Sequence, residues 1–180
     1  MSNFITVTKK IKSFKKTIEV SGDKSLSIRW ILLSSLANGT SVAKNLLMSE
    51  DVLAALKAVK KLGIKFSCKK NICKIYGKGI NGYKYKKNIT INAQNSGTLG
   101  RLILGLLINS PFKIKLIGDK SLSKRDFKRI SDPLSKFGAK FSLYKEKNLP
   151  LTIFGSKNLK PIKYNENKGS AQVKSAIILG

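Results

Sequence analysis

The chain has 180 residues and a formal net charge of +27, because 36 Lys and Arg stand against 9 Asp and Glu. Hydrophobic residues make up 42% of it, which supplies a buried core and excludes a mainly disordered chain. The longest apolar run, residues 102–108, is far too short to cross a membrane, and residues 1–20 lack a secretory signal. We therefore expect a cytoplasmic protein with no membrane partner.

The excess of basic residues is an excess of lysine. In all, 32 Lys are scattered along the chain beside only 4 Arg, at positions 29, 101, 125 and 129. Proteins that bind nucleic acid specifically favour Arg, whose guanidinium makes bidentate and stacked contacts. We therefore expect polyanion binding to be incidental, with no specific nucleic-acid partner. Where Arg is this scarce, each one is expected to lie where Lys would not serve.

Hydrophobic periodicity divides the chain into repeated units of strand, helix, strand, helix and two-stranded hairpin. This βαβαββ order predicts an α/β fold. The first unit covers about residues 20–80. Its predicted elements are a strand at 17–20, a helix at 26–37 ended by Asn38 and Gly39, a strand at 41–46, a helix between Ser49 and Gly63, and a hairpin at 64–68 and 72–76.

The second unit, about residues 88–155, follows the same plan. Its predicted elements are a strand at 88–93, a helix at 96–108, a strand at 113–117, a helix at 127–137, and a hairpin at 139–144 and 149–154. A third unit begins near residue 161 and stops at Gly180, inside an apolar helix pattern. We therefore expect the chain to be a fragment, truncated within its third unit.

Internal repetition supports this division. The hexapeptide at residues 22–27 recurs letter for letter at 118–123, and we interpret the recurrence as a mark of the repeat. Helix starts at Ser25, Ser96 and Ser170 are 71 and 74 residues apart.

Three of these helix starts carry small polar residues followed by a cation. They read Lys24-Ser25-Leu26-Ser27-Ile28-Arg29, Asn95-Ser96-Gly97-Thr98-Leu99-Gly100-Arg101 and Gly169-Ser170-Ala171-Gln172-Val173-Lys174. A helix N-terminus exposes backbone N–H groups and a partial positive charge, and Arg grips oxyanions bidentately. N-capping alone explains any one start. Three at a regular period favour a shared site for a small ligand with several phosphate or carboxylate groups.

Other motifs carry less chemistry. Arg125 and Arg129 have the spacing of one helical face, which fits either an oxyanion grip or a solvated basic face. The G-x-G-x-x-G pattern at 77–82 does not open a helix, so it predicts no dinucleotide site. Cys68 and Cys73 do not make a disulfide framework, and we expect a reducing compartment. Because the chain has no histidine, neither a metal site nor the commonest general base is expected.

Four stretches, residues 22–29, 95–98, 118–125 and 170–175, resemble the 5-enolpyruvylshikimate-3-phosphate (EPSP) synthase family, also called 3-phosphoshikimate 1-carboxyvinyltransferase. The resemblance implies two domains, each an inside-out α/β barrel of three βαβαββ units whose helix N-termini point at the cleft between the domains. By this resemblance, residues 1–19 join the other domain, residues 20–180 form an incomplete substrate-binding domain, and the full-length protein is a monomer.

The implied reaction transfers the enolpyruvyl group of phosphoenolpyruvate to the 5-hydroxyl of shikimate 3-phosphate and releases phosphate, in the shikimate pathway to chorismate and the aromatic amino acids. It uses no metal or organic cofactor. By motif, the catalytic Lys24 contacts both substrates. The residues implied for shikimate 3-phosphate are Lys24, Ser25, Arg29, Ser170, Ala171 and Gln172, and those for phosphoenolpyruvate are Lys24, Asn95, Gly97, Arg125 and Gln172.

The chain departs from the family pattern in places. Asp126 replaces a usual Pro, which either weakens the neighbouring Arg125 or caps the following helix, and Leu99 and Gly100 replace bulkier or more polar residues. The family's acidic catalytic residue and further substrate cations have no counterpart here, so we expect this chain alone to be inactive. The alternatives are the sister UDP-N-acetylglucosamine enolpyruvyl transferases, which have Asn in place of Ser25, and a basic non-enzymatic protein that binds polyanions.

Overall fold

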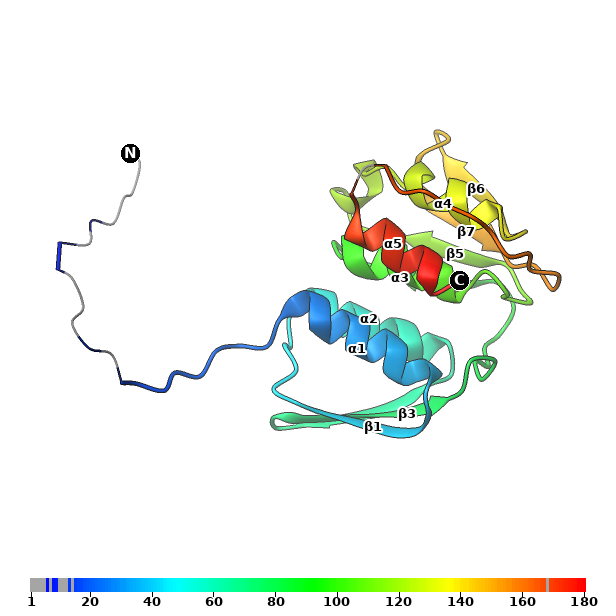
Figure 1. Ribbon diagram of the computed structural model, residues 1–180. Coiled ribbons are helices and arrows are strands. Elements are labelled where there is room, and N and C mark those ends of the chain that lie inside the picture. Colours follow the sequence, from blue (N-terminus) through cyan, green and yellow to red (C-terminus); the bar gives the residue numbers. More distant parts are fainter. Residues whose placement is uncertain (1–5, 7, 10–12, 14, 168) are drawn as a thin grey trace.

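The computed structural model describes residues 6, 8–9, 13, 15–167 and 169–180. Figure 1 shows helices lying between two sheets: α1 (Lys24–Leu36) and α2 (Glu50–Lys61) cover one sheet and face helices that cover the other. No helix within the described ranges is long and apolar enough to span a membrane. The predicted passage of residues 1–19 into another domain falls largely on residues outside these ranges.

The first sheet holds β1 (Asn38–Lys44), β2 (Lys65–Lys69) and β3 (Ile72–Lys78) in the antiparallel order β1-β3-β2. The strand predicted at 41–46 begins earlier, because Asn38 and Gly39 pair with the end of β3. The helix predicted to end before these two residues ends at Leu36, with Ala37 as its C-cap, so its predicted end is confirmed to within one residue.

The strand predicted at residues 17–20 is wrong. These residues form no strand in the structure, and Ile18 and Val20 are 71% and 70% exposed. The Asn45 side-chain amide donates to the Val20 carbonyl at 3.1 Å. Because β-branched residues favour a strand only where a neighbouring strand and a packed face receive them, local propensity does not decide this segment.

The second unit confirms the predicted βαβαββ order. It comprises β4 (Ile89–Asn92), α3 (Gly97–Leu106), β5 (Ile114–Ile117), α4 (Lys128–Ser135), β6 (Lys140–Tyr144) and β7 (Asn148–Phe154), with the 3₁₀ turn η1 (Leu122–Lys124) before α4. The sheet order is β4-β5-β7-β6, in which β4 and β5 are parallel and the other pairs antiparallel.

Helix α3 is the central element, since all ten of its residues are buried. The last helix, α5 (Ala171–Ile178), packs directly on it (Figure 1). A Cβ on Gly105 would lie 2.1 Å from the Ala176 carbonyl oxygen, so only glycine permits this approach of the two helices. The glycine thus sets how α5 sits against α3.

The repeated hexapeptide does not mark equivalent positions. In both copies the aspartate side chain accepts a 2.7 Å bond from the backbone N–H three residues on, Asp23 from Leu26 and Asp119 from Leu122. The first copy opens the 13-residue helix α1, whereas the second opens a three-residue 3₁₀ turn after β5. The identical letters encode the same cap at different places in two units.

Cys68 and Cys73 are joined by a disulfide, contrary to the expectation of a reducing compartment. The two residues face each other in the β2–β3 hairpin, where the register sets their Cα atoms 4.0 Å apart. Strand register, rather than the number of cysteines, brings them together.

Candidate functional site

The N-terminus of α1 carries the first predicted cluster. Lys24, the first residue of α1, places its Nζ 3.2 Å from Asp51 Oδ2 at the start of α2. An acid is favoured in that first turn by the helix dipole. The Lys24 side chain is 52% exposed, so the pair contributes little stability and leaves the ammonium free to meet another anion.

Arg29 ties α1 to α5. Its Nη1 donates to the Ser25 carbonyl at 3.3 Å and its Nη2 to Ser175 Oγ at 3.4 Å. Ser25 and Arg29, both predicted from the first helix start, therefore lie against α5, the helix that carries the third predicted start. Ser175 had no predicted role, although it closes the motif at residues 170–175.

Two guanidinium groups converge over the N-terminus of α3. The Ser96 hydroxyl caps the helix by accepting the Leu99 N–H at 3.3 Å. At Gly97, a Cβ would lie 2.8 Å from Arg101 Nη1 and 3.0 Å from Arg125 Nη1. The missing side chain leaves both cations and the helix N–H groups directed at one place, an arrangement suited to an oxyanion.

Arg125 is held by a short chain of hydrogen bonds. Its Nη2 donates to Asn95 Oδ1 at 3.0 Å, and Asn95 Nδ2 donates to Asp119 Oδ2 at 2.6 Å. The Leu122 backbone N–H above all, together with this Asn95 bond, lowers the pKa of the Asp119 carboxyl. Because guanidinium only donates and carboxylate only accepts, the orientation of the Asn95 amide is defined.

Asp126 caps the helix that follows. Its Oδ1 accepts the backbone N–H groups of Lys128 at 2.8 Å and Arg129 at 3.4 Å, which is the second of the two expected roles. Since α4 begins at Lys128, Arg125 lies before the helix in extended backbone, and the single helical face predicted for Arg125 and Arg129 is wrong.

The start of α5 adjoins the start of α3. Ser170 caps α5 by accepting the Val173 N–H at 3.4 Å, and Ala171 begins the helix. Gln172 Nε2 donates to Thr98 Oγ1 at 3.2 Å, which joins the two helix starts directly. In Figure 1, α1 and α5 run in the same direction, with their N-terminal ends at the left of the view.

Arg101 is the cation that the sequence placed at the second helix start, although the family resemblance gave it no substrate role. It is only 8% exposed, and its Nε has no hydrogen-bond partner. Burial first, and then the neighbouring charges of Arg129 and Arg125, lower the pKa of its guanidinium. The scarcity of Arg and the position of Arg101 at a helix start were the available signals.

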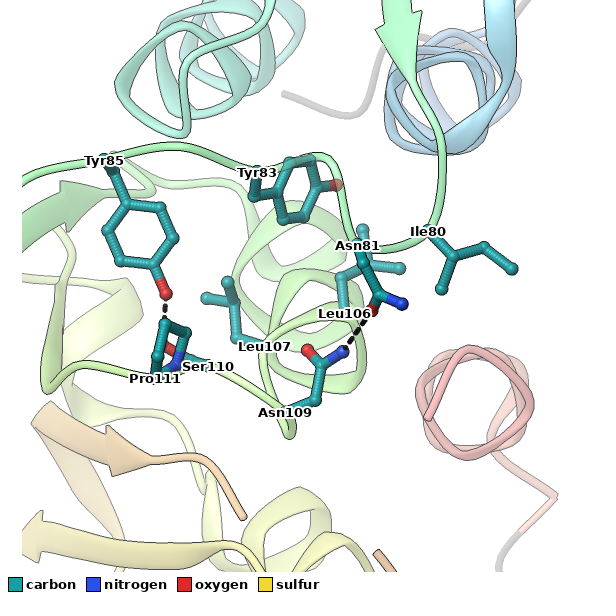
Figure 2. Close-up of a pocket in the computed structure, with 9 residues that line it drawn as sticks. All are labelled: Ile80, Asn81, Tyr83, Tyr85, Leu106, Leu107, Asn109, Ser110 and Pro111. Atoms are coloured by element: carbon teal, nitrogen blue, oxygen red, sulfur yellow. Dashed lines mark hydrogen bonds between the residues drawn. The ribbon is translucent and has the colours of Figure 1, made fainter. Parts of the chain in front are cut away.

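A separate hollow of about 210 Å³ lies at the other end of α3. Figure 2 shows Leu106 and Leu107 of this helix end facing Tyr83 and the Asn81–Asn109 amide pair. Helix C-termini present carbonyl oxygens and a partial negative charge, so this hollow does not suit an anion. The helix N-termini are therefore the candidate anion site.

No group of three His, Cys, Asp or Glu side chains that could hold a metal ion is found among the residues that the structure describes. The polar groups at the helix starts are instead N–H, guanidinium, ammonium, amide and hydroxyl donors. Donors of these kinds suit an oxyanion, which they can bind through charge-assisted hydrogen bonds.

The described residues form an α/β protein with one complete βαβαββ unit and a candidate anion-binding centre at its helix N-termini. Residues 8–180 match the family model described as EPSP synthase (3-phosphoshikimate 1-carboxyvinyltransferase). The chain belongs to the EPSP synthase family.

Relatives and solved structures agree with this family. The chain is 45% identical over 169 residues to the 3-phosphoshikimate 1-carboxyvinyltransferase of Streptococcus suis, which covers 93% of this chain. It is also 45% identical over 172 residues to that of Sulfurihydrogenibium sp., which covers 95% of it. The EPSP synthase structure of Acinetobacter baumannii matches with a TM-score of 0.85 at 38% identity, over 90% of this chain and 37% of that one. The chain spans 39% of the length of the curated relatives.

Proposed function

We propose that this chain supplies substrate-binding residues of a 3-phosphoshikimate 1-carboxyvinyltransferase. The single observation that carries the proposal is the convergence of Arg101 and Arg125 over Gly97, where the starts of α3 and α5 meet. We further propose that the chain works in the cytoplasm, without a cofactor or a specific nucleic-acid partner, and that the full-length enzyme is a monomer.

The reaction joins two anions, and this explains the donors gathered at the helix starts. The C5 hydroxyl oxygen of shikimate 3-phosphate bonds to C2 of phosphoenolpyruvate and loses its proton, while C3 gains one. The tetrahedral intermediate then loses phosphate from C2 and a proton from C3, which restores the C2–C3 double bond and gives the enol ether product. Holding both anions in contact removes much of the barrier, because the repulsion between them is offset by fixed positive charge.

Each helix start has a proposed share in binding. Ser25 and Arg29 of α1 and residues 170–172 of α5 hold shikimate 3-phosphate. Asn95, Gly97 and Arg125 hold phosphoenolpyruvate, and Gln172 touches both substrates. Lys24 contacts both, and its ion pair with Asp51 holds the ammonium at the start of α2, beside the site.

The proposal is tested by titrating the purified chain with shikimate 3-phosphate while its amide NMR spectrum is recorded. We expect saturable shifts at residues 24–29 and 170–172. Charge-assisted hydrogen bonds contribute about 1.5–3 kcal/mol each, so Arg29→Ala should weaken binding by about 10- to 100-fold. Lys128→Ala, at an exposed ion pair with Asp132 on α4, is the matched control and should leave binding unchanged.

Two outcomes would contradict the proposal: the absence of saturable shifts, or equal affinity in the Arg29→Ala variant. Binding to DNA that falls steeply with salt, without a response to shikimate 3-phosphate, would instead support the polyanion-binding alternative. The chain alone is expected to release no phosphate from phosphoenolpyruvate, and measurable release would contradict the expectation that it is inactive by itself.

A further inference from the structure

The Gln172 side chain can present either its oxygen or its NH₂ group to a ligand, and the two ends have opposite effects on an anion. We infer that Arg101 is a positioning residue that turns the NH₂ end of Gln172 into the substrate site. The identity of the ligand rests on the proposed function, whereas the orientation of the amide does not.

The hydrogen bonds of Gln172 define its orientation. Arg101 Nη1 lies 2.8 Å from Gln172 Oε1, and because a guanidinium has no acceptor, the atom facing it must be the amide oxygen. The opposite atom, Nε2, donates to Thr98 Oγ1 at 3.2 Å. This bond uses one of the two N–H groups on Nε2, and the second N–H remains to donate to a ligand.

Packing holds the guanidinium of Arg101 in place. The group lies 5.2 Å from the centre of the Phe127 ring, and Phe127 itself is fully buried. A Cβ on Gly100 would lie 3.3 Å from the end of this ring. Gly100 therefore makes room for Phe127, and Phe127 supports Arg101, which gives a physical reason for the small residue at a position where the family resemblance implies a larger one.

The polar partners of Arg101 are neutral oxygens. Besides Gln172, its guanidinium contacts the carbonyls of Gly97 at 3.5 Å and Asp126 at 3.4 Å. The nearby Asp126 carboxylate is occupied with the N-terminus of α4. A buried cation whose hydrogen-bond partners are all neutral costs stability, and its field is not cancelled at those partners. That field also polarises the Gln172 amide, which strengthens its N–H as a donor.

The first experiment observes the amide itself in the free protein. In the wild-type chain we expect the two Gln172 Nε2 protons to have resolved NMR signals, with the carbonyl bonded to Arg101. Arg101→Met keeps the contact with Phe127 and removes every donor, so the two signals should move toward those of a free glutamine side chain. Arg101→Lys retains one donor and should largely restore the wild-type signals. If both variants keep wild-type signals, Arg101 does not orient the amide.

The second experiment is a double-mutant cycle on shikimate 3-phosphate binding. Arg101→Met and Gln172→Leu should each weaken binding by about tenfold, and the double variant by little more than either, because Arg101 acts through Gln172. If the losses of affinity in the two single variants add in the double variant, Arg101 acts independently of Gln172, through its charge or through general structure, and the inference is overturned. Lys128→Met is the control, and thermal unfolding of each variant checks the fold.

The two proposals fail in different ways. If the wild-type chain does not bind shikimate 3-phosphate, the proposed function fails, while the amide signals still test the positioning role. If the wild-type chain binds it and the Gln172 signals ignore Arg101, only the positioning role fails. Should Arg101→Met not fold, Arg101→Lys and the wild-type spectrum still provide the readout: wild-type Gln172 protons at free-side-chain positions would overturn the inference.

Discussion

Gly97→Ala should separate substrate binding from stability. The new Cβ would lie 2.8 Å from Arg101 Nη1 and 3.0 Å from Arg125 Nη1, and both atoms are side-chain ends that can move without shifting the backbone. Relaxing to an ordinary contact of roughly 3.5 Å moves the two guanidinium groups by about 0.5–0.7 Å. The fold can absorb this shift, and since alanine favours a helix by up to about 1 kcal/mol over glycine, the free energy of unfolding should stay within about 1 kcal/mol of wild type.

The same shift misaligns the groups proposed to hold phosphoenolpyruvate. Loss of one charge-assisted hydrogen bond, about 1.5–3 kcal/mol, corresponds to binding weakened about 10- to 100-fold. Calorimetric titration with phosphoenolpyruvate in the presence of shikimate 3-phosphate measures the affinity, and urea unfolding measures the stability. Ser135→Ala, on the exposed side of α4, is the control. Unchanged affinity for phosphoenolpyruvate, or a loss of several kcal/mol of stability, would refute the reasoning.

Three further predictions concern stability and titration. Gly105→Ala should lower the free energy of unfolding in urea by several kcal/mol and speed hydrogen exchange in α5, because the new Cβ would lie 2.1 Å from the Ala176 carbonyl oxygen. A loss of stability no larger than that of Gly97→Ala would contradict this. Because the pKa of the Asp119 carboxyl is lowered in the folded state, its ionised form stabilises the fold above the unfolded-state pKa, and this stabilisation is lost as pH falls through the folded-state pKa. Asp119→Asn should therefore flatten the acid limb of a plot of unfolding free energy against pH. An unchanged acid limb would count against this prediction. Burial raises the pKa of Tyr83 to about 12, so in an ultraviolet titration this residue should ionise at a higher pH than free tyrosine. The free energy of unfolding should fall as pH rises from about 10 toward 12, because the unfolded chain ionises first. Ionisation of every tyrosine near pH 10 would disprove this.

Local signals in the sequence predicted most of the helices and the second sheet. Periodicity placed α3 and α5, and serine caps at Ser96 and Ser170 located their starts to within one residue. Motif resemblance brought Gly97 and Arg125 into one predicted site, and the structure places them together. The helices and their caps were predictable because capping and amphipathic patterns act within a few residues of one another, whereas the pairing of Gly97 with Arg125 came from the family resemblance.

The features that the sequence missed depend on contacts between distant residues. Arg101 meets Gln172 across 71 positions, a pairing that no local pattern contains. Residues 17–20 have the propensity for a strand but lie without a strand partner. The hexapeptide at 118–123 shows the same limit, since six identical residues specify a cap and leave the length of the following helix to its surroundings.

The central claim is that helix starts far apart in the chain serve one anionic ligand. A crystal structure of the chain soaked with shikimate 3-phosphate tests it most directly. The account predicts ligand density bounded by Ser25 and Arg29 of α1 and by Ser170 and Gln172 of α5. Density confined to another surface, such as the hollow at the far end of α3, with these four side chains free of ligand, would contradict it.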